Sequence, residues 1–285
     1  MRTFLDSYDE LPKMFRLFVL IILLTSSYGH CDAVPLRQSC INSLQVYKSY
    51  FKEEALNEIC GRVEKKETCN SANGEPIFHL DQKSKLEHPK KILVISLIHG
   101  DETHAGNVGR FWMERLMKVD ARNTWRVIPI VNPDGVKNKT RTNQKGVDLN
   151  RNFPTADWNA EAIKNWEVKE HKSPRKFPGT EAGAEPEVKC VMSHIDDFKP
   201  DFVISIHTPL KVLDFDGPNL KHRPPYEYLP WKSLGNFPGS LGRYLWVERT
   251  IPVLTTELKE NLPTNGTVFE QLQDLVGTLV KIDLK

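Results

Sequence analysis

Continuous apolar runs alternate with amphipathic segments along most of the chain. Four runs rich in β-branched residues are typical of strands buried on both faces of a sheet: residues 92–98, 125–131, 202–206 and 251–256. Apolar residues three or four positions apart predict helices after the first and the last of these runs, at residues 103–117 and 268–282. Strands that alternate with helices predict an α/β fold, with a mixed, mostly parallel β-sheet and helices on both faces.

The part of the chain before the first of these strands has a different pattern. Residues 41–66 carry apolar side chains three or four apart with charges between them, which predicts one helix. A turn-rich passage at residues 70–76 separates this helix from a short strand at residues 77–80. We therefore expect a small helical N-terminal segment over residues 32–76 and the principal domain over residues 77–285.

The N-terminus carries a targeting pattern. A basic residue, Arg16, precedes a short apolar run at residues 17–24, and small or polar residues follow. This is the pattern of a signal peptide within residues 1–31, so we expect a periplasmic or secreted protein. Since residues 1–13 are polar and acidic, either Met14 is the first residue of the signal or residues 1–13 extend it. The run is shorter than the ~20 residues of a membrane span, so we expect no stable span in the mature chain; a permanent anchor, or lipidation at Cys31, is the weaker interpretation.

Cysteine usage agrees with export. Cys40, Cys60, Cys69 and Cys190 form an even set beyond the signal region, which suggests disulfides formed in an oxidising compartment. If residues 41–59 form a single helix rising 1.5 Å per residue, Cys40 and Cys60 lie about 30 Å apart, far beyond the ~7 Å limit for a bridge. Cys60 with Cys69 is then the better local pair.

Size and charge exclude some classes of function. The 285 residues, of which 39% are hydrophobic, suffice for one large core. The 39 lysines and arginines nearly balance the 37 aspartates and glutamates, and no long basic block occurs. A nucleic acid is therefore not an expected partner.

Side chains that bind metals stand where the predicted strands end. His99 and Glu102 follow the first strand, His207 follows the third, and Glu257 follows the fourth. Because the carboxyl ends of parallel strands form one edge of a sheet, we expect these residues to meet there. Two imidazoles and a carboxylate are a typical ligand set for a hydrolytic zinc ion with an open position for water. A lone His-x-x-Glu also arises by chance in exposed loops, but its place at a strand end favours the metal.

The segment Asp148-Leu149-Asn150-Arg151-Asn152 extends this pattern. With it, the chain resembles the zinc carboxypeptidase family of the carboxypeptidase A type. The motifs HxxE, NPDG, an arginine, DxNRN, SxH and a late TxE occur in the family's order over roughly residues 90–285. The resemblance implies a zinc carboxypeptidase catalytic domain with one zinc ion per chain, held by His99, Glu102 and His207.

The resemblance also implies roles for five further residues. Glu257 is the general base, Arg141 polarises the scissile carbonyl, and Asn150 and Arg151 bind the substrate's terminal carboxylate. Asp148 orients a zinc-bound histidine, which is the expected role of a residue behind a metal ligand. General chemistry supports the set, because a carboxylate can carry the proton, a fixed cation can stabilise the oxyanion, and a planar guanidinium reads a carboxylate with two donors.

A narrower resemblance concerns the substrate. Residues 213–218, 236–242 and 255–258 look like the bacterial murein-peptide branch of the family, whose members hydrolyse the bond between γ-D-glutamate and diaminopimelate. Murein peptides are thus the expected substrate. A general secreted carboxypeptidase that trims peptides or proteins is the alternative, and an inactive zinc-binding or wall-binding module is a weaker one.

Three local features near the pocket stay open in the sequence. Asp214 and Asp216 are candidates for binding the ammonium group of diaminopimelate, but such residues are more often turn formers, as Asp216-Gly217-Pro218 suggests. The resemblance favours a cis bond between Thr208 and Pro209, against an ordinary trans turn. No tyrosine before Glu257 is assigned as a substrate cap; the three candidates are Tyr226, Tyr228 and Tyr244.

Overall fold

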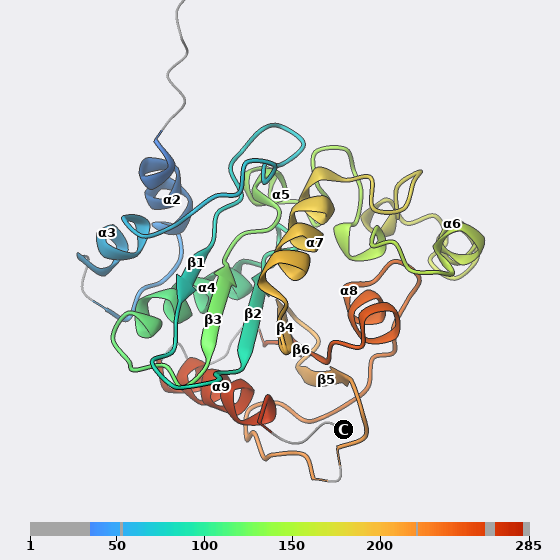
Figure 1. The fold of residues 1–285 in the computed structure, drawn as a ribbon. Coiled ribbons are helices and arrows are strands. Elements are labelled where there is room, and N and C mark those ends of the chain that lie inside the picture. Colours follow the sequence, from blue (N-terminus) through green and yellow to red (C-terminus); the bar gives the residue numbers. More distant parts are fainter. Residues whose placement is uncertain (1–34, 52–53, 221, 260–265, 282–285) are drawn as a thin grey trace, which may run out of the picture. The chain divides into compact units, whose positions relative to one another are not determined.

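A computed structural model describes residues 35–51, 54–220, 222–259 and 266–281 (Figure 1). The expected signal region, residues 1–31, lies outside them. Residues Leu36–Lys285 group as one compact unit, to which the description below applies. Within the described residues, no helix is both long enough and apolar enough to cross a membrane.

The centre of this unit is a six-stranded sheet with the order β1-β3-β2-β4-β6-β5. Its strands are β1 (Leu80–Gln82), β2 (Lys91–Ser96), β3 (Thr124–Ile128), β4 (Phe202–His207), β5 (Val212–Asp216) and β6 (Val253–Glu257). The four inner strands are parallel, and the edge strands β1 and β5 pair in the antiparallel direction. The expected mostly parallel mixed sheet is confirmed.

Both faces of the inner strands are buried, as their apolar runs predict. On β2, Ile92 and Val94 face one hydrophobic cluster, while Leu93 and Ile95 face the other. Helices α4 (Thr103–Leu116) and α9 (Gly266–Leu279) contribute to the first cluster, and α7 (Pro186–Phe198) contributes to the second. In Figure 1, α7 crosses in front of the strands, and α4 lies behind them. The helices expected at residues 103–117 and 268–282 are therefore present, on one side of the sheet.

Shorter helical elements connect these layers and shape the edge where the strands end. They are α5 (Pro133–Asn138), the 3-10 turns η1 (Leu149–Arg151) and η2 (Pro174–Lys176), α6 (Trp158–Val168), α8 (Leu241–Arg243) and the π-helical η3 (Tyr244–Glu248).

The expected single helix over residues 41–66 is wrong. The structure has two short helices instead, α2 (Leu36–Leu44) and α3 (Glu54–Cys60). Helix α2 ends because side chains of α4 bind the segment that connects it to α3. Arg110 donates to the carbonyl oxygen of Tyr47, and the Ser49 hydroxyl donates to Glu114. The two helices pack together with their cysteines within bridging distance.

The disulfide pairing inferred from that helix is consequently wrong as well. Cys40 bridges Cys60 across α2 and α3, with the Cα atoms 5.5 Å apart. Cys69 bridges Cys190 of α7, at a sequence separation of 121. Only a straight helix would hold Cys40 and Cys60 apart, and the turn after Leu44 ends that helix.

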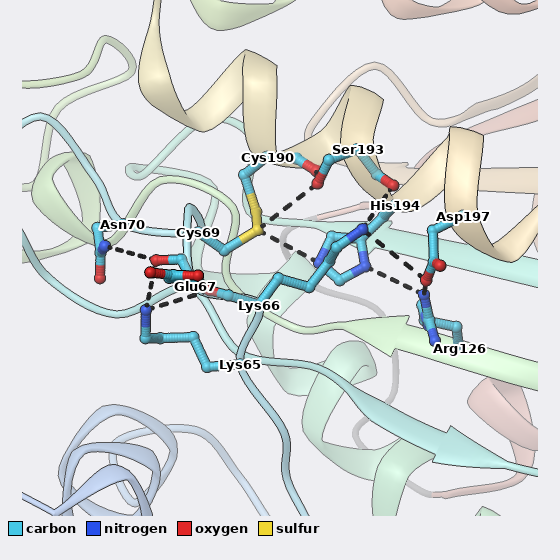
Figure 2. Close-up of a disulfide and its surroundings, with 10 residues drawn as sticks. All are labelled: Lys65, Lys66, Glu67, Cys69, Asn70, Arg126, Cys190, Ser193, His194 and Asp197. Carbon is cyan, nitrogen blue, oxygen red and sulfur yellow. Dashed lines mark hydrogen bonds and ion pairs between the residues drawn. A yellow bond between two sulfur atoms is a disulfide. The ribbon is translucent and has the colours of Figure 1, made fainter.

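The second disulfide joins the segment before β1 to α7, above a buried polar group (Figure 2). The His194 ring contacts the Cys69 sulfur through Nε2 at 3.5 Å and lies 3.4 Å from Arg126 through Nδ1. Burial first, then the nearby positive charges, lower the pKa of His194 to about 3, so its ring is neutral at physiological pH. Arg126 in turn donates to Asp197 at 3.0 Å. This group and the disulfide connect the N-terminal segment to the second hydrophobic cluster.

Candidate active site

Two neighbouring strand ends bring the three predicted metal ligands together. His99 and Glu102 lie in the turn between β2 and α4, and His207 is the last residue of β4, the neighbour of β2 in the sheet. All three side chains are buried, and their donor atoms lie within 4.8 Å of one another. The sheet edge therefore assembles the set that the sequence places at residues 99, 102 and 207.

The donor atoms converge on one point. His99 Nδ1 lies 2.8 Å from Glu102 Oε1, and His207 Nδ1 lies 3.0 Å from Glu102 Oε2. The two Nδ1 atoms face each other at 3.2 Å. Two imidazole nitrogens and a carboxylate that share one point form a donor set that suits zinc.

The other nitrogen of each ring has its own partner. His99 Nε2 lies 3.0 Å from Asp148 Oδ1, and His207 Nε2 lies 2.9 Å from Ser205 Oγ. A proton held on Nε2 by these oxygens leaves the lone pair of each Nδ1 free to bind a metal, which is the usual arrangement behind metal-bound histidines. The residues present therefore fit a zinc ion held by His99, Glu102 and His207. The sequence showed Ser205 only as a letter of the SxH motif, although its spacing of two along a strand places it on the same face as His207.

Asp148 connects the metal ligands to the rest of the site. Its Oδ1 accepts from the Asn150 backbone N–H at 3.0 Å and also faces His99 Nε2. Its Oδ2 accepts from Arg141 Nε at 3.0 Å. Burial alone would raise the pKa of Asp148, but Arg141, His99 and Arg151 together hold that pKa well below its usual range. A permanent negative charge at this position fixes His99, Arg141 and the start of η1 relative to one another.

A close backbone contact holds the turn that carries His99 and Glu102. A Cβ atom at Gly100 would lie 2.0 Å from the carbonyl carbon of Gly135, so only glycine fits at position 100. Asn132 supports the same contact, because its side chain accepts from the Gly135 N–H and donates to the carbonyl oxygens of Ile98 and Arg141. The NPDG and HxxE motifs thus pack against each other.

Glu257 stands beside the predicted metal ligands. It is the last residue of β6 and pairs in register with His207 on β4. Its side chain is buried, lines the same cavity as His99, Glu102 and Arg141, and accepts from the Leu210 N–H at 3.2 Å. The Arg141 guanidinium also reaches Glu102, at 3.4 Å. The predicted base, the predicted oxyanion donor and the metal ligands thus share one cavity of about 440 Å³.

The predicted carboxylate clamp lines the same cavity. The Arg151 side chain is buried over the ring of Phe237, with its Cζ atom 4.4 Å from the ring centre. Its Nη1 donates to the Asn150 carbonyl oxygen, but no carboxylate in the described part of the chain forms an ion pair with Arg151. Burial, reinforced by Arg141 and opposed by Asp148, lowers the pKa of Arg151. Arg151 is thus a desolvated cation open to an anionic ligand; its contact with Phe237 has no signal in the sequence.

Asn150 forms a structural contact in addition to its place in the cavity. Its side-chain oxygen accepts from the Leu241 N–H at 2.8 Å, at the start of α8. The residue still lines the cavity. Asn150 therefore joins η1 to α8, while its amide nitrogen is the group available for a substrate carboxylate.

Asp214 and Asp216 belong to β5, a strand that the sequence did not indicate. Both line the cavity, on the same face of the strand. Asp216 accepts from Asn236 Nδ2 at 3.3 Å. The turn at residues 217–218 begins only after them, so the two aspartates are strand residues and not turn formers.

Two smaller expectations have clear outcomes. The bond between Thr208 and Pro209 is cis. Among the described residues that line the cavity there is no tyrosine. Tyr226 donates to the Val268 carbonyl oxygen, and Tyr244 packs on Phe153 inside the second hydrophobic cluster.

Comparison with known proteins places this geometry in a family. Residues 52–227 match the family model described as zinc carboxypeptidase. Murein peptide amidase A of Vibrio campbellii is 31% identical over 217 residues, which cover 73% of this chain and 84% of that protein. Murein peptide amidase A of Escherichia coli K12 is 33% identical over 124 residues, or 43% of this chain, and the chain spans only 50% of the length of that relative.

Two solved structures share the fold. The murein-tripeptide amidase of Escherichia coli O157 superposes with a TM-score of 0.56 at 23% identity, covering 79% of this chain and 93% of that one. Bovine thrombin-activatable fibrinolysis inhibitor superposes with a TM-score of 0.59 at 20% identity, covering 80% and 92%. The family model covers more than half of the chain, and the chain therefore belongs to the zinc carboxypeptidase family.

Proposed function

We propose that this protein is a zinc-dependent peptide hydrolase that cleaves the amide bond next to a free C-terminal carboxylate. One observation carries the proposal. One cavity is lined by a donor set that suits zinc, a carboxylate in register with one of its histidines, and a buried arginine that forms no ion pair with any described residue. Hydrolysis at a metal and recognition of a terminal carboxylate need these three groups together.

The residues divide the work by position. Zinc held by His99, Glu102 and His207 would supply Lewis-acid chemistry and lower the pKa of a water molecule. The Glu257 carboxylate is placed to take the proton that hydrolysis releases and to return it to the leaving nitrogen. Arg141, fixed by Asp148, presents a cation to the oxygen on which negative charge develops.

We propose murein peptides as the substrate, with cleavage of the γ-D-glutamyl–diaminopimelate bond. The names of the two amidases that align with the chain, and the sequence segments shared with that branch, support this choice. Buried disulfides at Cys40–Cys60 and Cys69–Cys190 support a periplasmic or secreted location, because such bonds persist in oxidising compartments.

The test is hydrolysis by purified, zinc-loaded protein. The murein tripeptide L-Ala-γ-D-Glu-meso-diaminopimelate and an N-blocked dipeptide of ordinary L-residues are incubated separately, and the products are identified by mass spectrometry. We expect release of diaminopimelate from the tripeptide and little turnover of the dipeptide, with Glu257→Gln as the inactive control. Comparable turnover of both substrates would indicate a general carboxypeptidase, and turnover of neither would indicate an inactive zinc-binding module.

A further inference from the structure

A second cavity, of about 530 Å³, lies at the opposite edge of the sheet from the active site. It is lined by the turn before β3 and by α9, and Figure 1 shows α9 beside the start of that strand. Helix α4 begins next to the metal ligand Glu102, and its last residue, Leu116, lines this cavity. Fourteen residues at 1.5 Å each separate the two places by about 20 Å.

Two buried amide side chains in this cavity each keep one atom without a hydrogen-bond partner. Asn123 is 3% exposed and donates through Nδ2 to the Gly277 carbonyl oxygen at 3.3 Å. Gln273 is 2% exposed, and its Oε1 accepts from Arg115 Nη1 at 2.7 Å. Because a carbonyl only accepts and a guanidinium only donates, these contacts fix both amides. Asn123 Oδ1 and Gln273 Nε2 therefore remain without a partner among the described residues, which is uncommon and costly for buried polar atoms.

The two unpaired atoms have complementary requirements. Asn123 Oδ1 needs a donor, and Gln273 Nε2 needs an acceptor. A carboxylate only accepts and an ammonium group only donates, so neither satisfies both atoms. A secondary amide supplies both groups. In its trans form the N–H and the carbonyl point to opposite sides, which suits partners that come from two elements, the turn before β3 and α9.

The surroundings of the pair favour an amide that ends in a small apolar group. Leu116 and Trp125 are buried and line the cavity. A Cβ atom at Gly277 would lie 3.5 Å from Asn123 Nδ2 and 3.9 Å from Trp125 Cζ2, so an aromatic edge bounds the space beside the amide. A peptide bond within a chain carries a large substituent on each side, whereas an acetamido group ends in a methyl group that such a recess can hold. Exposed side chains that can bind sugar hydroxyls also line the cavity: Arg122, Asp274 and Thr278.

We propose that Asn123 and Gln273 form a second ligand site, separate from the active site, that binds the acetamido group of an N-acetylated sugar. Asn123 Oδ1 accepts from the amide N–H, Gln273 Nε2 donates to the amide carbonyl oxygen, and the methyl group packs against Trp125. The site takes no part in cleavage and so goes beyond the proposed function. One consequence does rest on that function: on murein, the site would hold the glycan while the active site takes a peptide.

The experiment compares two sugars that differ only in the acetamido groups. Tri-N-acetylchitotriose and cellotriose share one β-1,4-linked backbone, but cellotriose carries hydroxyl groups in place of the acetamido groups. Titration calorimetry on the purified, zinc-loaded protein should show at least about tenfold tighter binding of tri-N-acetylchitotriose, because two neutral hydrogen bonds discriminate by this order. Equal binding of the two sugars, or no binding of tri-N-acetylchitotriose, would overturn the site.

Two variants of α9 locate the binding. Gln273→Glu keeps an acceptor for Arg115 but replaces the unpaired donor with a second acceptor, so the affinity for tri-N-acetylchitotriose should fall at least about tenfold. Gln271→Glu is the matched control, because it makes the same change on the same helix at an exposed residue outside this cavity. Affinity that survives Gln273→Glu, or an equal loss in both variants, would contradict the assignment.

A third variant tests the cavity without any change of charge. Alanine fits at position 277, because its Cβ would make only ordinary contacts and alanine favours a helix more than glycine. Gly277→Ala should therefore keep the thermal unfolding temperature at or above the wild-type value, while its methyl group narrows the recess beside Asn123 and weakens sugar binding. Unchanged affinity in this variant would place the sugar elsewhere.

These binding measurements separate the site from the proposed function, since they require no turnover. Sugar binding by a protein that hydrolyses no peptide would leave the site standing, and hydrolysis by a protein that binds no sugar would remove the site alone. A peptide ligand is the competing outcome. N-acetyl-dialanine methylamide should not displace tri-N-acetylchitotriose, and displacement at comparable concentration would mean that the cavity binds peptide chains instead.

Discussion

The carboxylates of the active-site cavity fall into two regions that handle charge in opposite ways. At the sheet edge, Glu102 and Asp148 are buried among histidines and arginines that compensate them. On β5, Asp214 is buried and Asp216 is half-buried, and Asn236 is the single side-chain donor to them among the described residues. Compensation makes the first region rigid and ready to position a metal, whereas the second region retains an unmet charge that a ligand can satisfy.

The largest expected effect lies at Glu257, between the two regions. Glu257→Gln keeps the shape of the side chain but cannot carry a proton, so kcat should fall by about 100-fold or more. Zinc content and thermal unfolding, measured on the same sample, should stay at the wild-type values. Retention of most of the turnover would remove Glu257 from the mechanism.

Removing a charge from the compensated region should lower the affinity of the site for zinc. Asp148→Asn removes the charge that orients His99 and Arg141, and loss of such a partner commonly reduces zinc affinity by roughly 10-fold to 100-fold. Competition with a chelator measures this affinity directly. Asp157→Asn is a suitable control, because Asp157 pairs with Arg243 away from the metal ligands. Equal zinc affinity in wild type and Asp148→Asn would mean that Asp148 does not support the site.

Arg151 is the cationic counterpart of the second region, since it too forms no ion pair within the described part of the chain. Arg151→Ala should lower kcat/KM at least about tenfold on a free-acid peptide, through loss of charge-assisted hydrogen bonds. The same variant should hardly change the slow cleavage of the C-terminally amidated analogue. Equal losses on both substrates would show that Arg151 is structural and that the enzyme need not act at a chain end.

The smallest effect concerns stability and pH. The pKa of Asp214 is about 6 in the folded protein and about 4 in an unfolded chain, so Asp214 stays protonated to a higher pH in the folded state. The resulting penalty is absent below about pH 4, grows as the pH rises from about 4 to 6, and is fully present above about pH 6. Since the carboxylate lines a cavity and is not enclosed in the core, the penalty is discounted to on the order of 1 kcal/mol.

Asp214→Asn should therefore raise the free energy of unfolding at about pH 8 and not at about pH 4, with urea denaturation as the measurement. Glu170→Gln, which removes an acid that Lys176 compensates, should not stabilise the protein under the same alkaline condition. A destabilised Asp214→Asn protein there would show that the Asp214 charge is compensated after all.

Much of the sheet and the metal end of the cavity could be predicted from the sequence. Buried parallel strands appear as continuous apolar runs, and a parallel sheet gathers its strand ends, so the pattern of the chain alone places His99, His207 and Glu257 together. Long-range contacts have no such pattern. The bridge between Cys69 and Cys190 spans 121 residues, and no local feature encodes it.

The local sequence pattern gave wrong predictions of secondary structure where tertiary contacts override it. Residues 41–66 have helical spacing, yet contacts with Arg110 and Glu114 of α4 break the helix and allow Cys40 to reach Cys60. Strand β5 was hidden because Asp214 and Asp216 interrupt its apolar character, as expected for a strand whose polar face lines a cavity.

Zinc content of the His207→Ala protein tests most directly whether the strand ends assemble a hydrolytic zinc site. Purified wild-type and variant proteins are dialysed against the same metal-free buffer, and bound zinc is measured by atomic emission. We predict one zinc ion per wild-type chain and no stoichiometric zinc in a folded His207→Ala chain. Tight, stoichiometric zinc in the variant would be incompatible with the ligand set of His99, Glu102 and His207.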